Sequence, residues 1–116
     1  MLSFEEVKRI SNEFNKQFAF KNDKVIFEMY YCSGFQNYLC TPELRPNKPF
    51  VFSWIFPRYQ MEKGELWYCH SSQYDVNDNH RKVDYHDIMT EEEYQKYLEG
   101  LKYWEDNLKS IRYGRK

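Results

Sequence analysis

The sequence predicts an α+β fold made of an N-terminal helix, an antiparallel sheet of about four strands and a C-terminal helix, with both helices packed on one sheet face. Near the N-terminus, Ser3 stands three residues before Glu6. Thr90 stands equally far before Glu93 in the last quarter of the chain. Each pair matches a capping box, in which the two residues satisfy each other's free backbone N–H groups at the start of a helix. Short aromatic runs between the two boxes predict the sheet.

Apolar residues spaced three and four apart predict the two helices. The first is expected over residues 4–17, with a stripe made of Phe4, Val7, Ile10, Phe14 and Phe18. The second begins after Thr90, and its stripe consists of Tyr94, Tyr97, Leu98, Leu101, Trp104, Leu108 and Ile111. Gly100 interrupts this stripe at a cost of about 1 kcal/mol relative to alanine, which we expect the apolar contacts to outweigh.

The middle of the chain predicts antiparallel strands separated by loops. Alternating side chains predict a strand over 25–32, and a weaker segment over 36–41 would pair with it. Three prolines within 41–49 predict a loop without a regular element, because proline lacks the backbone N–H that a sheet uses, although residues 41–43 could begin one helical turn. Residues 75–81 are expected to form a polar loop, and residues 83–88 a short final strand.

The clearest hairpin is predicted between residues 50–59 and 65–72. A three-residue loop that ends at Gly64 would join them, since glycine readily takes the left-handed conformation that such a loop needs. In this register His70 faces Phe56 across the hairpin, so we expect His70 to lie in the core.

Length and charge limit the classes of function. The 116 residues suit one α+β domain, 1–116, with a single core. The formal net charge of -1 gives neither the basic excess of a general nucleic-acid binder nor the strongly acidic surface of a nucleic-acid mimic.

The cysteines and the short apolar runs predict a cytoplasmic protein without membrane association. Cys32, Cys40 and Cys69 are odd in number and lack C-x-x-C spacing, which favours a reducing compartment. The longest apolar stretch, 50–56, is too short to cross a bilayer, and the first residues lack the apolar region of a signal peptide. The single alanine and the many Lys, Asn, Tyr, Phe and Ile residues are typical of AT-rich coding sequences, which favours a bacterial, phage or plasmid source.

The three histidines are candidates for a metal site or for acid–base chemistry. His70, His80 and His86 follow Cys69 closely, and thiolate and imidazole are ligands that zinc prefers. Their spacing matches no standard metal-binding pattern, so we expect neither a metal nor another cofactor. The same histidines are the side chains suited to proton transfer near neutral pH.

The surplus of aromatic residues predicts a surface that binds another protein. Aromatic residues make up 20% of the chain. On the predicted sheet, the face away from the helices carries Tyr30, Tyr59 and Trp67, with Arg58 at its margin. Tyr, Trp and Arg most often anchor protein interfaces. Alternatively, loops of the same chain could fold over this face, or a second copy could bury it in a homodimer.

We therefore expect a non-enzymatic protein-binding module, most concretely a small inhibitor or immunity-type protein that blocks its partner's surface. Tyr59 and Trp67 would anchor the contact, with Tyr30 and Arg58 in support. One alternative is a small hydrolase or nuclease that uses the histidine cluster, with or without zinc. A second is stacking of single-stranded bases on the aromatic face, for which the strands supply few cations.

Overall fold

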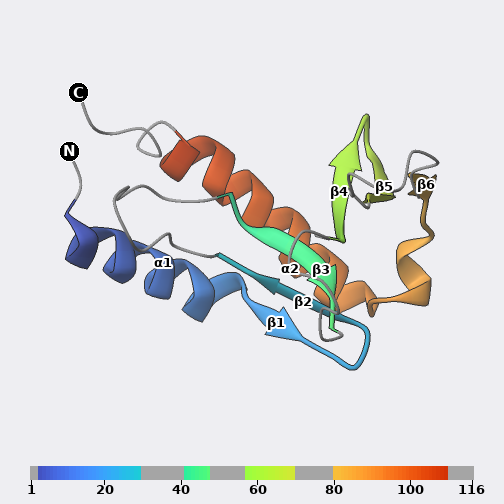
Figure 1. The fold of residues 1–116 in the computed structure, drawn as a ribbon, viewed down its shortest axis with the longest axis horizontal. Coiled ribbons are helices and arrows are strands. Elements are labelled where there is room, and N and C mark those ends of the chain that lie inside the picture. Colours follow the sequence, from blue (N-terminus) through green and yellow to red (C-terminus); the bar gives the residue numbers. More distant parts are fainter. Residues whose placement is uncertain (1–2, 30–40, 48–56, 70–79, 110–116) are drawn as a thin grey trace, which may run out of the picture.

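The computed structural model describes residues 3–29, 41–47, 57–69 and 80–109. It confirms the predicted α+β fold of an N-terminal helix, an antiparallel sheet and a C-terminal helix (Figure 1). The elements in chain order are α1 (Phe4–Phe18), β1 (Phe20–Lys21), β2 (Val25–Glu28), β3 (Glu43–Pro46), β4 (Arg58–Glu62), β5 (Glu65–Cys69), β6 (Arg81–Lys82), a 3-10 helix (Tyr85–Asp87), α2 (Glu91–Tyr103) and a π-helical turn (Trp104–Leu108). The sheet has six strands, of which β1 and β6 are only two residues long.

Both predicted capping boxes form. The backbone N–H of Glu6 donates to Ser3 Oγ at 3.1 Å, and the N–H of Ser3 donates to Glu6 Oε1 at 3.0 Å. Thr90 and Glu93 exchange the same two bonds at 2.9 and 3.1 Å. The N–H of Ser3 beside the Glu6 carboxylate lowers the pKa of that carboxyl. The local sequence therefore fixes where both helices begin.

The six strands pair in chain order, each antiparallel to the next. The prediction that residues 41–49 contain no regular element is wrong, because β3 lies within them and pairs with β2. Pro46 ends this strand, a position where a missing N–H does little to the ladder. Leu44, 1% exposed, gives β3 its anchor in the core. The predicted segment 36–41 and most of 50–59 lie outside the described residues.

The β4–β5 turn is tighter than predicted. Glu62 pairs with Glu65, so the loop consists of Lys63 and Gly64 alone. Both have positive φ, 52° and 80°, as a two-residue hairpin turn of the I′ type requires. The predicted three-residue loop was wrong by one residue, and a one-residue change of register moves every side chain of one strand to the other face.

Residues 83–88 were predicted to form a strand, and this is wrong. The last strand, β6, is two residues long and ends at Lys82. A 3-10 helix follows, and Asp84 caps it by accepting a hydrogen bond from the His86 N–H at 3.0 Å. Asp and Asn often form such local side-chain bonds, which compete with strand pairing.

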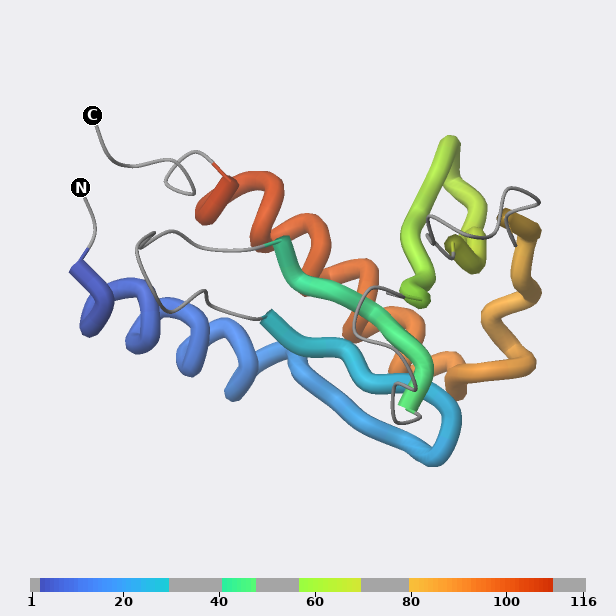
Figure 2. The backbone as a smooth tube through the Cα atoms, in the orientation of Figure 1, coloured from blue at the N-terminus to red at the C-terminus, as the bar shows by residue number. Residues whose placement is uncertain are grey.

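Both helices pack on one face of the sheet, and the core lies between them and β2. The Phe27 ring lies 4.9 Å from that of Tyr97 in α2 and 6.1 Å from that of Phe14 in α1, measured between centroids. A single residue pair, Leu44 and Tyr59, joins β3 to β4. Figure 2 shows that β4 and β5 rise away from β1, β2 and β3.

Candidate functional site on the outer face of β4, β5 and β6

The register of β4 and β5 sorts their side chains onto two faces. Tyr59 lies opposite Tyr68 and next to Leu44, so these residues belong to the side of the sheet that faces the core. Arg58 lies opposite Cys69, and Gln60 lies opposite Trp67, on the other side. We call this side the outer face; its residues are Arg58, Gln60, Glu62, Glu65, Trp67, Cys69, His80 and Lys82.

The four residues predicted to bind a partner do not share one surface. Arg58 and Trp67 lie on the outer face, and both are half-buried. Tyr59 lies on the other face, where its ring packs 5.3 Å from that of Tyr68 and burial raises its pKa. Placing Tyr59 beside Trp67 was therefore wrong, and the cause is the one-residue error in the turn. Tyr30 lies outside the described residues.

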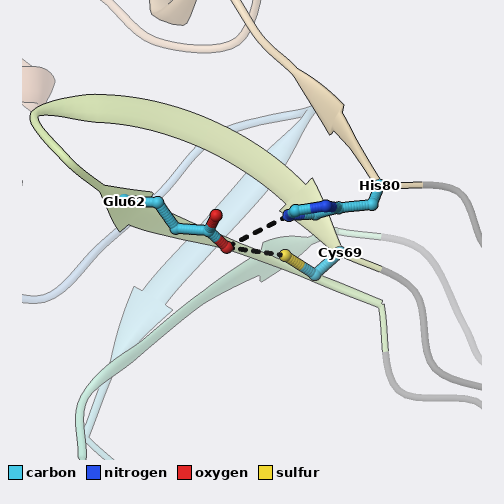
Figure 3. A group of neighbouring side chains, drawn as sticks. All are labelled: Glu62, Cys69 and His80. Carbon is cyan, nitrogen blue, oxygen red and sulfur yellow. Dashed lines mark hydrogen bonds and ion pairs between the residues drawn. The ribbon is translucent and has the colours of Figure 1, made fainter.

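Two of the four predicted metal candidates meet on the outer face, together with a residue that was not predicted. His80 Nε2 lies 3.1 Å from Glu62 Oε2, and Cys69 Sγ lies 3.7 Å from the same oxygen (Figure 3). The three side-chain atoms all lie within 4.8 Å of one another. We call these three residues the Glu–Cys–His cluster.

The other two candidates do not belong to this cluster. His86 pairs with Asp84 instead, at 2.7 Å between Nδ1 and Oδ1, and its side chain is 63% exposed. Among the described residues, the metal-ligating atoms that come together are those of the Glu–Cys–His cluster, and His86 is not one of them. His70 lies outside the described residues.

Hydrogen bonds from neighbouring side chains orient the Glu62 carboxylate. Gln60 Nε2 donates to Glu62 Oε2 at 2.9 Å, and Arg58 Nε donates to Gln60 Oε1 at 3.4 Å. The bond from Gln60, followed by that from His80, lowers the pKa of Glu62. The outer face thus carries a continuous polar row along β4 that ends at an ionised carboxylate.

Cys69 is not set up as a nucleophile. Burial raises the pKa of its thiol, and the nearby Glu62 carboxylate raises it further. A reactive cysteine needs the opposite environment, with a cation or helix N-terminus that stabilises the thiolate. The cluster therefore offers sulfur, nitrogen and oxygen ligand atoms rather than a catalytic Cys–His pair.

Trp67 and His80 stack on each other across β5 and the start of β6. Their ring centroids are 4.7 Å apart and the planes are inclined by 29°. Lys82 pairs with Glu65 at 2.8 Å, which neutralises a cation of this face. The centre of the outer face is thus aromatic and its charges are largely compensated.

A pocket of about 440 Å³ opens where β4 separates from β3. Glu43, Arg58 and Tyr59 line its strand side, and Tyr97 and Leu101 of α2 line the other. Arg58 therefore belongs both to the outer face and to this pocket. Burial raises the pKa of Glu43, and the Arg58 guanidinium partly offsets that effect.

We expect Glu43→Gln to stabilise the fold at pH 7, by about 0.5 kcal/mol, because partial burial disfavours the charged form of the Glu43 carboxyl more than the nearby Arg58 guanidinium favours it. A raised folded-state pKa means that the folded state binds more protons, so wild-type stability falls as pH rises through that pKa. The advantage of Gln should therefore disappear below the unfolded-state pKa. Urea unfolding at pH 7 and at pH 3 measures it, with Glu13→Gln on the exposed side of α1 as the control.

Sequence reasoning missed Glu62 and Gln60. The available signal was Gly64 after Lys63, because glycine is the preferred second residue of a two-residue hairpin turn of the I′ type. A hairpin centred on that pair places Glu62, Gln60 and Trp67 on one face.

Comparison with known proteins gives no further guide to the site, since no family model, curated protein or solved structure matches the chain. No helix in the described residues is long and apolar enough to cross a membrane.

Proposed function

We propose that this protein acts by binding another protein through its outer face, as a small inhibitor or immunity-type protein that blocks its partner's surface. One observation carries the proposal: Arg58 and Trp67 share the face of the β4–β5 hairpin opposite to the one that carries Tyr59 and the buried Leu66. Trp and Arg are the residues most enriched in interface hot spots, because they combine a large contact area with hydrogen-bond donors.

Both anchors are held in place before a partner arrives. Trp67 stacks on His80, and Arg58 bonds to Gln60. Ordering a flexible side chain at an interface costs about 0.5–1.5 kcal/mol, so anchors that are already ordered bind at lower cost. The pocket beside Arg58 offers a recess for a side chain of the partner.

The partner that fits this surface presents an acidic group to Arg58 beside an apolar surface for Trp67. Arg58 lies near the half-buried Glu43 and donates one hydrogen bond to Gln60, which leaves further guanidinium N–H groups of the side chain for a partner's carboxylate. The flanking Lys82 is already paired with Glu65.

The two alternatives, binding of single-stranded nucleic acid and a hydrolase or nuclease built on histidines, have less support in the described part of the sheet. Single-stranded nucleic acid needs free cations along the backbone track, whereas Arg45 pairs with Glu28 and Lys82 with Glu65. A hydrolase built on several histidines needs them to converge, whereas His80 and His86 bond to different carboxylates.

Affinity capture with variants tests the proposal. Tagged wild-type protein is incubated with a low-GC bacterial lysate, with and without nuclease, beside an Arg58→Ala, Trp67→Ala double variant. We expect one stoichiometric protein that survives nuclease and that the double variant fails to retain. Arg9→Ala, on the exposed side of α1, is the matched control and should retain it.

Circular dichroism and thermal unfolding confirm that the double variant is folded. Retention of the partner by a folded double variant would refute the outer face as the binding surface. Loss of all bound material after nuclease treatment would refute protein binding in favour of nucleic acid.

A further inference from the structure

We propose that the Glu–Cys–His cluster is a zinc site, in which Glu62, Cys69 and His80 each supply one ligand and solvent supplies the fourth. The three residues come from β4, β5 and the residue before β6. Figure 3 shows their side chains converging on one point between the strands. The proposal goes beyond protein binding and stands independently of it.

The distances fit a tetrahedral zinc ion. Zinc binds nitrogen and oxygen at about 2.0–2.2 Å and sulfur at about 2.3 Å, so its tetrahedral ligand atoms lie about 3.3–3.8 Å apart. The contacts of Glu62 Oε2 with His80 Nε2 and Cys69 Sγ are 3.1 and 3.7 Å. Since the third distance is also within 4.8 Å, shifts of about 1 Å complete the geometry.

The ligand chemistry selects zinc over the common hard cations. Calcium and magnesium prefer six or more oxygen ligands, and the cluster supplies one carboxylate. A thiolate, an imidazole and a carboxylate together are a ligand set that Zn²⁺ accepts. On binding, the Cys69 thiol releases its proton to solvent, and the ion compensates the charges of the thiolate and of Glu62.

The neighbours of the cluster act as supports for such ligands. Gln60 Nε2 donates to the Glu62 carboxylate at 2.9 Å, and the Trp67 ring stacks on the His80 imidazole. Metal ligands in proteins are regularly oriented by outer groups of this kind. The side chains of His80 and Glu62 are 43% and 33% exposed, which leaves room for water at the fourth position.

The test uses the full chain, reduced, freed of metal with a chelator and titrated with Co²⁺ and then with Zn²⁺. Cobalt bound to a thiolate gives a near-ultraviolet charge-transfer band, which reports the Cys69 sulfur directly. We expect one Co²⁺ per chain with that band, and its displacement by one Zn²⁺. Mg²⁺ should cause no displacement.

Variants assign the ligands. Cys69→Ser should remove the band, and His80→Ala should weaken Zn²⁺ binding by more than the about 10- to 100-fold that loss of a supporting group costs. Gln60→Leu should weaken it within that range. His86→Ala, an exposed histidine beside a carboxylate, and a Cys32→Ser, Cys40→Ser double variant are the controls and should bind as the wild type does.

Three results would overturn the proposal. They are binding without saturation, an unchanged cobalt band in Cys69→Ser, and loss of the band in the Cys32→Ser, Cys40→Ser control. Because serine is nearly isosteric with cysteine, Cys69→Ser should keep its fold, which circular dichroism checks. The titration contains no partner protein, so its failure would leave the proposed protein-binding function unaffected.

Discussion

Replacing Asn22 with alanine is expected to lower the free energy of unfolding by about 3 kcal/mol, because this side chain makes four hydrogen bonds. Its oxygen accepts from the N–H groups of Lys24 and Val25 at 2.7 and 2.8 Å. Its amide donates to the Ile88 carbonyl and to Glu93 Oε1 at 3.0 and 2.9 Å. Asn22 therefore ties the β1–β2 turn to the start of α2, and alanine leaves two part-buried backbone groups, the Val25 N–H and the Ile88 carbonyl, without this partner.

Two further variants separate this role from a general effect of losing an asparagine. Asn12→Ala changes an exposed side chain on α1 and should alter stability by less than about 0.5 kcal/mol. Asn22→Asp keeps the acceptor but places a carboxylate against Glu93 and a carbonyl oxygen, so it should also destabilise. Urea unfolding at pH 7 measures all three, and equal stability of Asn22→Ala and wild type would contradict the role assigned to Asn22.

Replacing Gly100 with valine is expected to lower the free energy of unfolding by about 2–3 kcal/mol, even though glycine is a poor helix former. A Cβ at this position would stand 2.9 Å from Phe27 Cε2 and 3.1 Å from Phe18 Cβ. The Phe27 ring is fully buried against Tyr97 and cannot move aside. The glycine that interrupts the apolar stripe is thus a point where α2 approaches β2 closely.

Glu99→Val is the matched control, because it introduces the same side chain one residue earlier on the exposed side of α2. Its effect should stay below about 0.7 kcal/mol, the helix propensity term alone. Phe27→Leu combined with Gly100→Val should show a coupling energy of about 0.5–3 kcal/mol, since the smaller side chain relieves the contact. Equal effects of the two valine variants in thermal and urea unfolding would contradict the close approach.

The helices were predictable from the sequence because their signals are local. A capping box spans four residues, and each apolar stripe repeats within one element. Alternation in 25–29 was equally local, and Val25, Phe27 and Met29 are buried as that pattern predicts. Six strands rather than four appeared because two-residue strands such as β6 carry no pattern of their own.

The wrong predictions concern features that depend on pairing with a neighbouring strand, namely the loop at Gly64 and strand β3. Whether the loop at Gly64 has two or three residues hardly changes the local sequence, yet it decides which side of the sheet Tyr59 occupies. The proline-rich β3 forms because Leu44 fills a place in the core beside Phe27, which its own residues do not indicate.

The candidate site was predictable in part. Cys69 and His80 stood out as ligand types, but proximity in the sequence grouped them with His70 and His86. The third group, Glu62, stands seven residues before Cys69, and only the folded hairpin and β6 bring the three side chains together. The types of ligand residue could therefore be predicted from the sequence. Which three residues come together depends on how β4, β5 and β6 pair, and the sequence alone does not show that.

Site-specific photo-crosslinking tests whether the outer face contacts a partner protein, as we propose. A photoreactive phenylalanine analogue replaces Trp67 in one sample and the exposed Lys16 of α1 in another, and each is irradiated with the captured partner. We expect a crosslink to the partner from position 67 and none from position 16. A crosslink from position 16 with none from position 67 would contradict binding through the outer face.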